Sequence, residues 1–228
     1  LIEVCNNFRP DLIVLGHADL VDVNTLLDIK KNSPSIRIAQ WFLDPLNMNG
    51  PDFEKNKKRI LDKINAIDAS FLTTSPNVLD FINKKDNFHF IPNPTDPSFE
   101  TLNNFSNYCE MDVFYAISHG VHRGKLKTGK YDERQNFLES LITQSPGVKF
   151  DIYGLNKIQP IWGDSFLKSI ANSKMGLNLS RGKPIKYYSS DRIAQIVGNG
   201  LLNLIDENTL YRDFFSDKEM IFYKNIGD

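Results

Sequence analysis

Apolar and polar positions alternate along the chain in a pattern that predicts short buried strands separated by amphipathic helices. In the first half, strands are predicted over residues 11–16, 36–42, 69–73 and 88–91. Helices are predicted between them over residues 21–31, 55–67 and 76–84. The first strand is apolar without interruption, which is typical of a parallel sheet that is covered on both faces.

The second half repeats this alternation after a proline-rich interruption. Prolines at positions 92, 94 and 97 favour an extended segment, and we interpret residues 92–110 as a linker. Strands are predicted over residues 111–117, 148–153, 174–179, 201–206 and 220–223, and helices over 132–143, 166–173 and 211–215. Alternating strands and helices predict an α/β protein with two Rossmann-like domains and parallel sheets. We expect these domains at residues 1–91 and 111–228, and an incomplete N-terminal domain because it has only four strands.

The stretch 186–206, KYYSSDRIAQIVGNGLLNLID, predicts a loop, a short helix, a glycine break and a buried strand. Ser189 or Ser190 is a suitable N-cap, and Arg192, Gln195 and Asn199 share one polar face at helical spacing. A helix N-terminus beside hydroxyl groups suits a phosphate, and Gln195 and Asn199 could then contact the hydroxyl groups of a sugar or ribose. The alternative is an ordinary amphipathic helix whose polar face is solvated.

Basic and glycine-containing loops follow other predicted strands of the second half. The candidates for contact with an anion are His119, Gly120, Arg123, Lys125, Gly154, Arg181 and Lys186. Because the carboxyl ends of parallel strands meet at one edge of a sheet, we expect these loops to form an anion site there. The alternative for residues 118–127 is a flexible, solvated basic loop.

Two candidates for acid–base chemistry follow strands of the first half. His17 comes after the strand at 11–16, and Asp44 comes after the strand at 36–42. Ligands of open α/β sheets bind beyond the carboxyl ends of the strands, and a carboxylate or imidazole there can take up a proton as a general base. The structural alternatives are a loop histidine and an aspartate that begins a turn before Pro45.

The composition narrows the classes of function. The 228 residues are 41% hydrophobic and 24% charged, with a net charge of −1, which argues against a nucleic-acid partner. No apolar run approaches the roughly 20 residues of a membrane span, and no signal peptide is visible, so we expect a cytoplasmic protein. Cys5 and Cys109 match no metal-ligand spacing and are expected to be reduced thiols. No Asp-x-Asp motif is present that could hold a catalytic metal.

A family resemblance rests on Ser190, Arg192 and Gly200, on the strand that ends at Asp206, and on the aromatic residues after it. Together they resemble the C-terminal signature of GT-B-fold glycosyltransferases. The pattern is similar to the S-x-R-x-x-E-x-x-x-x-G motif of the group around the spore-maturation protein CgeB. Gln195 stands where that motif has glutamate, so the side chain keeps its hydrogen bonds but lacks the charge.

The resemblance implies a metal-independent glycosyltransferase that moves a sugar from a nucleotide-sugar donor to a glycan, a lipid-linked or a protein acceptor. The donor would bind the C-terminal half without a further cofactor, and the acceptor would bind the N-terminal half. Arg123 and Lys125 would hold the diphosphate, and Ser189 and Ser190 would contact its other oxygens. Gln195 would contact the ribose or the sugar, and Asp44 or His17 would be the base of an inverting enzyme.

Other interpretations stay open. A nucleotide-sugar epimerase of the same fold needs acid–base carboxylates, for which only Asp44 is well placed. The substitution at Gln195 favours a non-catalytic module that binds a sugar nucleotide or a glycan. In related enzymes the loop at 155–164 contacts the nucleotide base, although for Trp162 we favour core packing. We expect no integral membrane segment, and a peripheral association with the inner membrane surface stays open.

Overall fold

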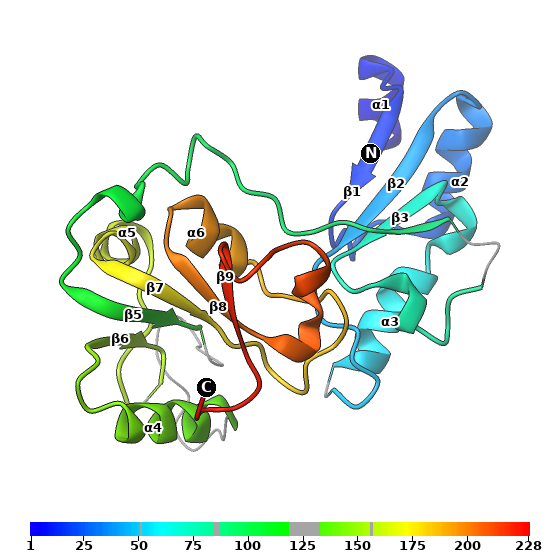
Figure 1. Ribbon diagram of the computed structural model, residues 1–228. Coiled ribbons are helices and arrows are strands. Elements are labelled where there is room, and N and C mark those ends of the chain that lie inside the picture. Colours follow the sequence, from blue (N-terminus) through cyan, green and yellow to red (C-terminus); the bar gives the residue numbers. More distant parts are fainter. Residues whose placement is uncertain (51, 84–86, 119–132, 156) are drawn as a thin grey trace. The chain divides into compact units, whose positions relative to one another are not determined.

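The computed structural model describes residues 1–50, 52–83, 87–118, 133–155 and 157–228, which form two compact units. The N-terminal unit comprises Leu1–Pro92 together with Ile185–Tyr188, and the C-terminal unit comprises Asn93–Pro184 and Ser189–Asp228. Each unit is built around a parallel β-sheet (Figure 1). The predicted fold class, an α/β protein with parallel sheets consistent with two Rossmann-like domains, is therefore confirmed.

The N-terminal unit has a four-stranded sheet in the order β1-β2-β3-β4. Its strands are β1 (Leu12–Leu15), β2 (Arg37–Phe42), β3 (Ala69–Leu72) and β4 (Phe88–Phe90). Its helices are α1 (Ile2–Phe8), α2 (Val23–Asn32) and α3 (Phe53–Leu61), with short 3₁₀ turns η1 (Ile64–Ala66) and η2 (Pro76–Val78). All four predicted strands are present, because each is an apolar run that the sheet buries at least in part.

The first strand departs from the prediction. Leu12 and Val14 are 54% and 60% exposed, whereas Leu15 is buried against Leu26 and Ile38. Successive side chains of a strand point to opposite faces, so one face of β1 packs in the core and the other lies open. The expectation of a sheet covered on both faces is therefore wrong at β1.

Two predicted helices are also wrong. Residues 76–83 form only the turn η2, after which Leu79 is extended, and residues 211–215 begin with the 3₁₀ turn η5 (Tyr211–Asp213). Leu79 and Tyr211 are both buried in core clusters. Packing of these side chains outweighs the local preference for a helix.

Asp68 ties three elements of the N-terminal unit together. Its Oδ2 accepts hydrogen bonds from the Ile38 N–H at 2.7 Å and from Lys30 Nζ at 2.9 Å. Burial alone would raise the pKa of Asp68, but these two bonds outweigh burial and lower the pKa from its ordinary value of 3.8. The ionised carboxylate therefore links α2, β2 and the start of β3.

The C-terminal unit has a five-stranded parallel sheet in the order β6-β5-β7-β8-β9. Its strands are β5 (Met111–Ala116), β6 (Phe150–Tyr153), β7 (Ser173–Asn178), β8 (Leu202–Asp206) and β9 (Met220–Tyr223). Its helices are α4 (Glu133–Gln144), α5 (Gly163–Ala171) and α6 (Arg192–Gly198), with further 3₁₀ turns at η3 (Asn104–Ser106) and η4 (Glu207–Thr209).

The helices of this unit cover opposite faces of its sheet (Figure 1). Tyr115 packs in the cluster beneath α4 with Leu138, while the neighbouring Phe114 packs with Ile170 of α5 and Ile196 of α6. The alternation along β5 thus fixes which helix lies on which face. Both faces of the central strands are buried, and the carboxyl edge of the sheet is left for the loops.

Candidate functional site

A cavity of about 440 Å³ lies at the carboxyl edge of the five-stranded sheet. Polar and aromatic lining residues include Ser118, Arg134, Trp162, Asp191, Arg192 and Gln195. They come from the end of β5, from α4, from the segment after β6 and from the start of α6, which follows β7. Because β5 lies between β6 and β7 in the sheet, their ends are adjacent, and the cavity has the size of a small-molecule site.

Arg192 braces this edge of the sheet. It is only 9% exposed, and its Nε donates to the Ala116 carbonyl at 3.1 Å. Its Nη1 donates to the Leu179 carbonyl at 3.3 Å and to Ser190 Oγ at 2.8 Å. The guanidinium also lies over the Tyr115 ring, 5.0 Å from the centroid. One side chain therefore joins the ends of β5 and β7 to the loop before α6, and one face of it still reaches the cavity.

The two serines before α6 do not cap the helix. The helix begins after Asp191 without a side-chain cap. Ser189 is 1% exposed, and its hydroxyl lies 2.9 Å from Tyr211 Oη, while Ser190 Oγ donates to Asn178 Oδ1 at 3.2 Å. The predicted N-cap is therefore wrong, because both hydroxyl groups are committed to other elements. Contact of either serine with a phosphate stays a prediction, with less exposed surface for it at Ser189.

Gln195 and Asn199 do not share a solvated face. Gln195 is half-buried and lines the cavity. Asn199 is buried, where its Oδ1 accepts from the Leu102 N–H at 3.3 Å and its Nδ2 donates to the Gln195 carbonyl at 2.9 Å. Asn199 thus fastens the segment before β5 to the end of α6, and the prediction that it contacts a sugar is wrong.

Trp162 is not a core residue. Its side chain is 54% exposed, and it lines the cavity immediately before α5. The interpretation as core packing, favoured from the sequence, is wrong because the loop after β6 carries the indole outward to the sheet edge. An exposed aromatic ring beside a cavity of this size is suited to stack on a planar ligand group.

Gly154 has a structural role at the same edge. Its φ of +82° is in the left-handed region, and a Cβ there would lie 1.9 Å from the Ile117 carbonyl oxygen. Only glycine allows β6 to end this close to β5. Contact of Gly154 with a ligand stays a prediction.

The other candidates for contact with an anion either do not line the cavity or lie outside the described residues. Arg181 is exposed in the loop after β7. Lys186 belongs to the segment that packs in the N-terminal unit, where its Nζ lies 4.8 Å from the Tyr187 ring. Neither side chain lines the cavity. His119, Gly120, Arg123 and Lys125 lie outside the described residues.

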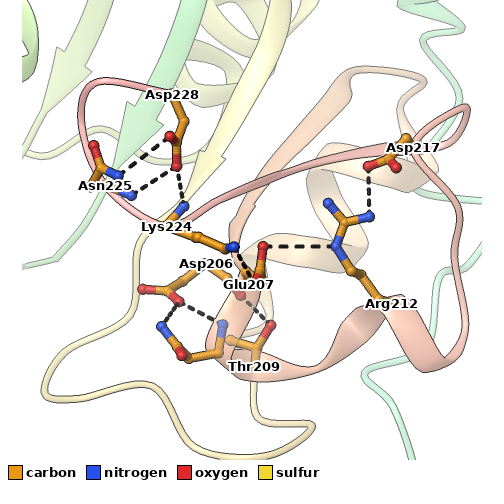
Figure 2. A network of polar contacts seen from close by, with 9 residues as sticks. Asp206, Glu207, Thr209, Arg212, Asp217, Lys224, Asn225 and Asp228 are labelled. Atoms are coloured by element: carbon orange, nitrogen blue, oxygen red, sulfur yellow. Dashed lines mark hydrogen bonds and ion pairs between the residues drawn. The ribbon is translucent and has the colours of Figure 1, made fainter.

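Acidic groups dominate the opposite end of this sheet edge, after β8 and β9 (Figure 2). Arg212 reaches Asp217 at 2.8 Å and Glu207 at 4.0 Å, and Lys224 Nζ lies 3.4 Å from Glu207. Asp228 accepts from the Lys224 N–H at 2.7 Å. These exposed pairs contribute little stability, and their carboxylates make this end less suited to an anion than the Arg192 end.

In the N-terminal unit the two acid–base candidates meet. His17 follows β1 and Asp44 follows β2, and these strands pair in parallel. His17 Nε2 lies 3.5 Å from Asp44 Oδ2, and the His17 ring stacks on Phe42 with centroids 5.3 Å apart. Both side chains are about two-fifths exposed. A partly exposed imidazole–carboxylate pair is able to accept a proton from a bound hydroxyl group.

Arg59 belongs to this site and was not predicted. Its Nη1 lies 3.8 Å from Asp44 Oδ2, and its Nη2 lies 2.5 Å from Asp19 Oδ2. The hydrogen bond from Arg59 lowers the pKa of Asp19. Together with Asp44, polar residues of α3 line a second cavity of about 240 Å³. The helical spacing of those residues is visible in the sequence, but their proximity to Asp44 is not.

Two features are absent from the described ranges. No helix there combines the length and the apolar character that a membrane span requires. No group of three or more His, Cys, Asp or Glu side chains among those residues is arranged to hold a metal ion.

Open α/β sheets bind their ligands outside the carboxyl ends of the strands, and the cavity of the C-terminal unit lies at that edge. Residues 133–228 match a family described as glycosyl transferase-like. The C-terminal region is thus similar to glycosyl transferase-like domains over these residues. No curated protein matches the chain at a significant level.

Proposed function

We propose that the protein is a glycosyltransferase that moves a sugar from a nucleotide-sugar donor, bound in the C-terminal unit, to an acceptor. The observation that carries the proposal is the overlap between the family match and the cavity. Trp162, Arg192 and Gln195 lie within the matched residues, and all three line the cavity. The CgeB-like motif from Ser190 to Gly200 supports the same assignment.

In this proposal the donor is held by complementary groups. The Trp162 indole stacks on the nucleotide base, as exposed aromatic rings do in nucleic-acid-binding proteins. The Gln195 amide contacts the ribose or the sugar. Arg123 and Lys125 hold the diphosphate and offset the negative charge that develops on the leaving group, so that no metal is needed.

The acceptor reacts at the N-terminal unit. Asp44 Oδ1 takes the proton of the attacking hydroxyl group if the reaction inverts the anomeric configuration, and His17 lies beside it as the second candidate. The hydroxyl oxygen then forms the new glycosidic bond, and the nucleoside diphosphate leaves with the electrons of the broken bond.

Calorimetric titration with nucleotide diphosphates and nucleotide sugars, with and without magnesium, tests the donor site. We expect one nucleotide to bind without metal. Trp162→Ala should weaken binding of that nucleotide by about tenfold, because stacking on an aromatic ring contributes about 1–3 kcal/mol per base. Tyr108→Ala is the matched control, since Tyr108 is an exposed aromatic residue of the same unit outside the cavity. If both variants bound the nucleotide with equal affinity, Trp162 would not belong to the donor site.

A non-catalytic sugar-nucleotide-binding module is the second candidate, because an uncharged Gln195 lines the cavity where the motif has glutamate. Turnover separates the two. Transfer or hydrolysis of the donor supports the enzyme, whereas tight binding without release of nucleotide diphosphate supports the module. An epimerase would convert the donor sugar in the absence of any acceptor.

A further inference from the structure

One face of α3 forms a polar wall in the N-terminal unit. Asp52, just before the helix, and three residues within it follow at positions i, i+3, i+4 and i+7, so they project to one side. With Asp44 and Pro45 they line the cavity of about 240 Å³; the helical members are Lys55, Asn56 and Arg59. We call this the α3 cavity.

Asn56 has an acceptor that the protein leaves open. The residue is 3% exposed, and its Nδ2 donates to the Pro45 carbonyl at 3.2 Å. Its Oδ1 makes no hydrogen bond to any described residue, although the side chain lines the cavity. This oxygen is not among the buried side-chain atoms without a partner in the described residues, so it is accessible at the cavity wall, where solvent or a ligand can donate to it.

Asp44 also has one polar atom that is held by the protein and one that is open. Its Oδ2 lies 3.5 Å from His17 Nε2 and 3.8 Å from Arg59 Nη1. Arg59 is itself fastened to Asp19, which limits its movement. The other oxygen, Oδ1, has no hydrogen bond or ion pair within the described part of the chain. One carboxylate oxygen is therefore held while the other is open to accept.

The charges of the α3 cavity balance. Two carboxylates, Asp44 and Asp52, face two cations, Lys55 and Arg59. A ligand with a net charge would be attracted by the two side chains of opposite charge and repelled by the two of like charge. A hydroxyl group both donates and accepts, so an uncharged polyol can satisfy acids, bases and an amide together. The volume lies below the roughly 300 Å³ at which pockets for drug-sized ligands begin, which favours a single ring.

We infer that the α3 cavity binds one uncharged sugar unit of the acceptor. Its hydroxyl groups donate to Asp44 Oδ1 and Asn56 Oδ1 and accept from Lys55 and Arg59. The inference rests on the proposed function, because only a transferase has an acceptor. It deepens that proposal by making the acceptor the end of a glycan rather than a protein side chain. Binding of the sugar itself requires neither donor nor turnover.

Titration of the labelled protein, followed by amide chemical shifts, tests the inference. The probes are methyl glucoside, methyl galactoside and methyl mannoside, compared with methyl glucuronide, methyl glucosaminide and glucose 6-phosphate. We expect saturable shifts on α3 with at least one neutral glycoside and weaker binding of its charged counterparts. Lys55→Met should weaken that binding about tenfold, equivalent to about 1.4 kcal/mol. Lys58→Met is the matched control, because Lys58 is an exposed lysine of the same helix outside the cavity.

The outcomes separate this inference from the proposed function. Absence of saturable shifts on α3, a preference for a charged sugar, or equal affinities of the two lysine variants would overturn the sugar assignment. The titration with nucleotides tests the C-terminal unit instead. If the sugar assignment failed but nucleotide binding were retained, the transferase proposal would stand. Sugar binding at α3 without any nucleotide binding would overturn the transferase proposal instead and leave a glycan-binding site.

Discussion

Replacement of Arg192 by alanine should destabilise the C-terminal unit by more than the loss of a positive charge alone would. Arg192→Ala removes three donated hydrogen bonds, which leaves the carbonyl oxygens of Ala116 and Leu179 without that donor. At about 1 kcal/mol for each bond and about 0.5–1 kcal/mol for the contact with the Tyr115 ring, the loss is about 3–4 kcal/mol. The guanidinium is desolvated in the folded state, which offsets part of this loss, so we expect about 3 kcal/mol.

The expected change in melting temperature is large enough to measure by scanning calorimetry. A chain of this size loses about 2–4 °C per kcal/mol, so Arg192→Ala should lower Tm by about 6–12 °C. Arg212→Ala is the matched control, because Arg212 also lies over an aromatic ring and makes ion pairs, but is 41% exposed. An exposed pair contributes about 0–1 kcal/mol, so the control should change Tm by a few degrees at most.

The variant Arg192→Lys distinguishes a stabilising role of the guanidinium hydrogen bonds from a role of the positive charge alone. Lysine keeps the positive charge but lacks the planar fork that reaches two carbonyl groups and a hydroxyl group at once. If bracing dominates, Arg192→Lys should lose most of the stability that Arg192→Ala loses. A loss in Tm below about 2 °C for Arg192→Ala, or wild-type Tm for Arg192→Lys, would refute the bracing role. Nucleotide affinity measured at a temperature where both variants stay folded then shows whether the charge also contacts the donor.

Three further predictions concern other positions. Gly154→Ala should destabilise the protein by about 2–4 kcal/mol in urea denaturation, because the methyl group meets the Ile117 carbonyl at a positive φ; unchanged unfolding would contradict the close approach. Asp68→Asn should lower stability at neutral pH, where the wild-type carboxylate is ionised. Since the folded pKa lies below the unfolded value of 3.8, the difference should shrink as pH falls through the folded pKa; a constant difference would contradict the role of the Lys30 bond. Gln195→Glu should raise donor turnover if the amide limits catalysis, as product release would show, and no gain with intact donor binding would favour the binding module.

The strands and their direction were predictable, because buried apolar runs between helices leave few alternatives to parallel sheets. All nine predicted strands are present in the described parts of the two units. The short helices were less predictable. Residues such as Leu79 and Tyr211 suit a helix locally, yet each is drawn into a core cluster that local spacing does not reveal. The open face of β1 was also hidden, since Leu12 and Val14 are as apolar as the buried residues beside them.

The candidate site was predictable where strand ends determine it. His17 and Asp44 meet because parallel neighbours end at one edge, and Arg192 and Gln195 reach the cavity for the same reason. What could not be foreseen is how each polar side chain is used. Ser189 carries a hydroxyl group that could contact a ligand, but this group forms a hydrogen bond with Tyr211, more than twenty residues away in the sequence. Such partners follow from the packed structure and not from the spacing within one segment.

The failure of the serine cap changes which groups can recognise the donor. A seven-residue helix without a side-chain cap, preceded by hydroxyl groups that bond elsewhere, offers a phosphate little beyond backbone groups. Two arginines of the described residues line the cavity, Arg134 and Arg192, and three N–H groups of Arg192 are already committed to the protein. Neutralisation of a diphosphate there therefore has to come mainly from further cations. This makes Arg123 and Lys125, in the segment after β5, more important to the proposed function than the helix start that first suggested a phosphate site.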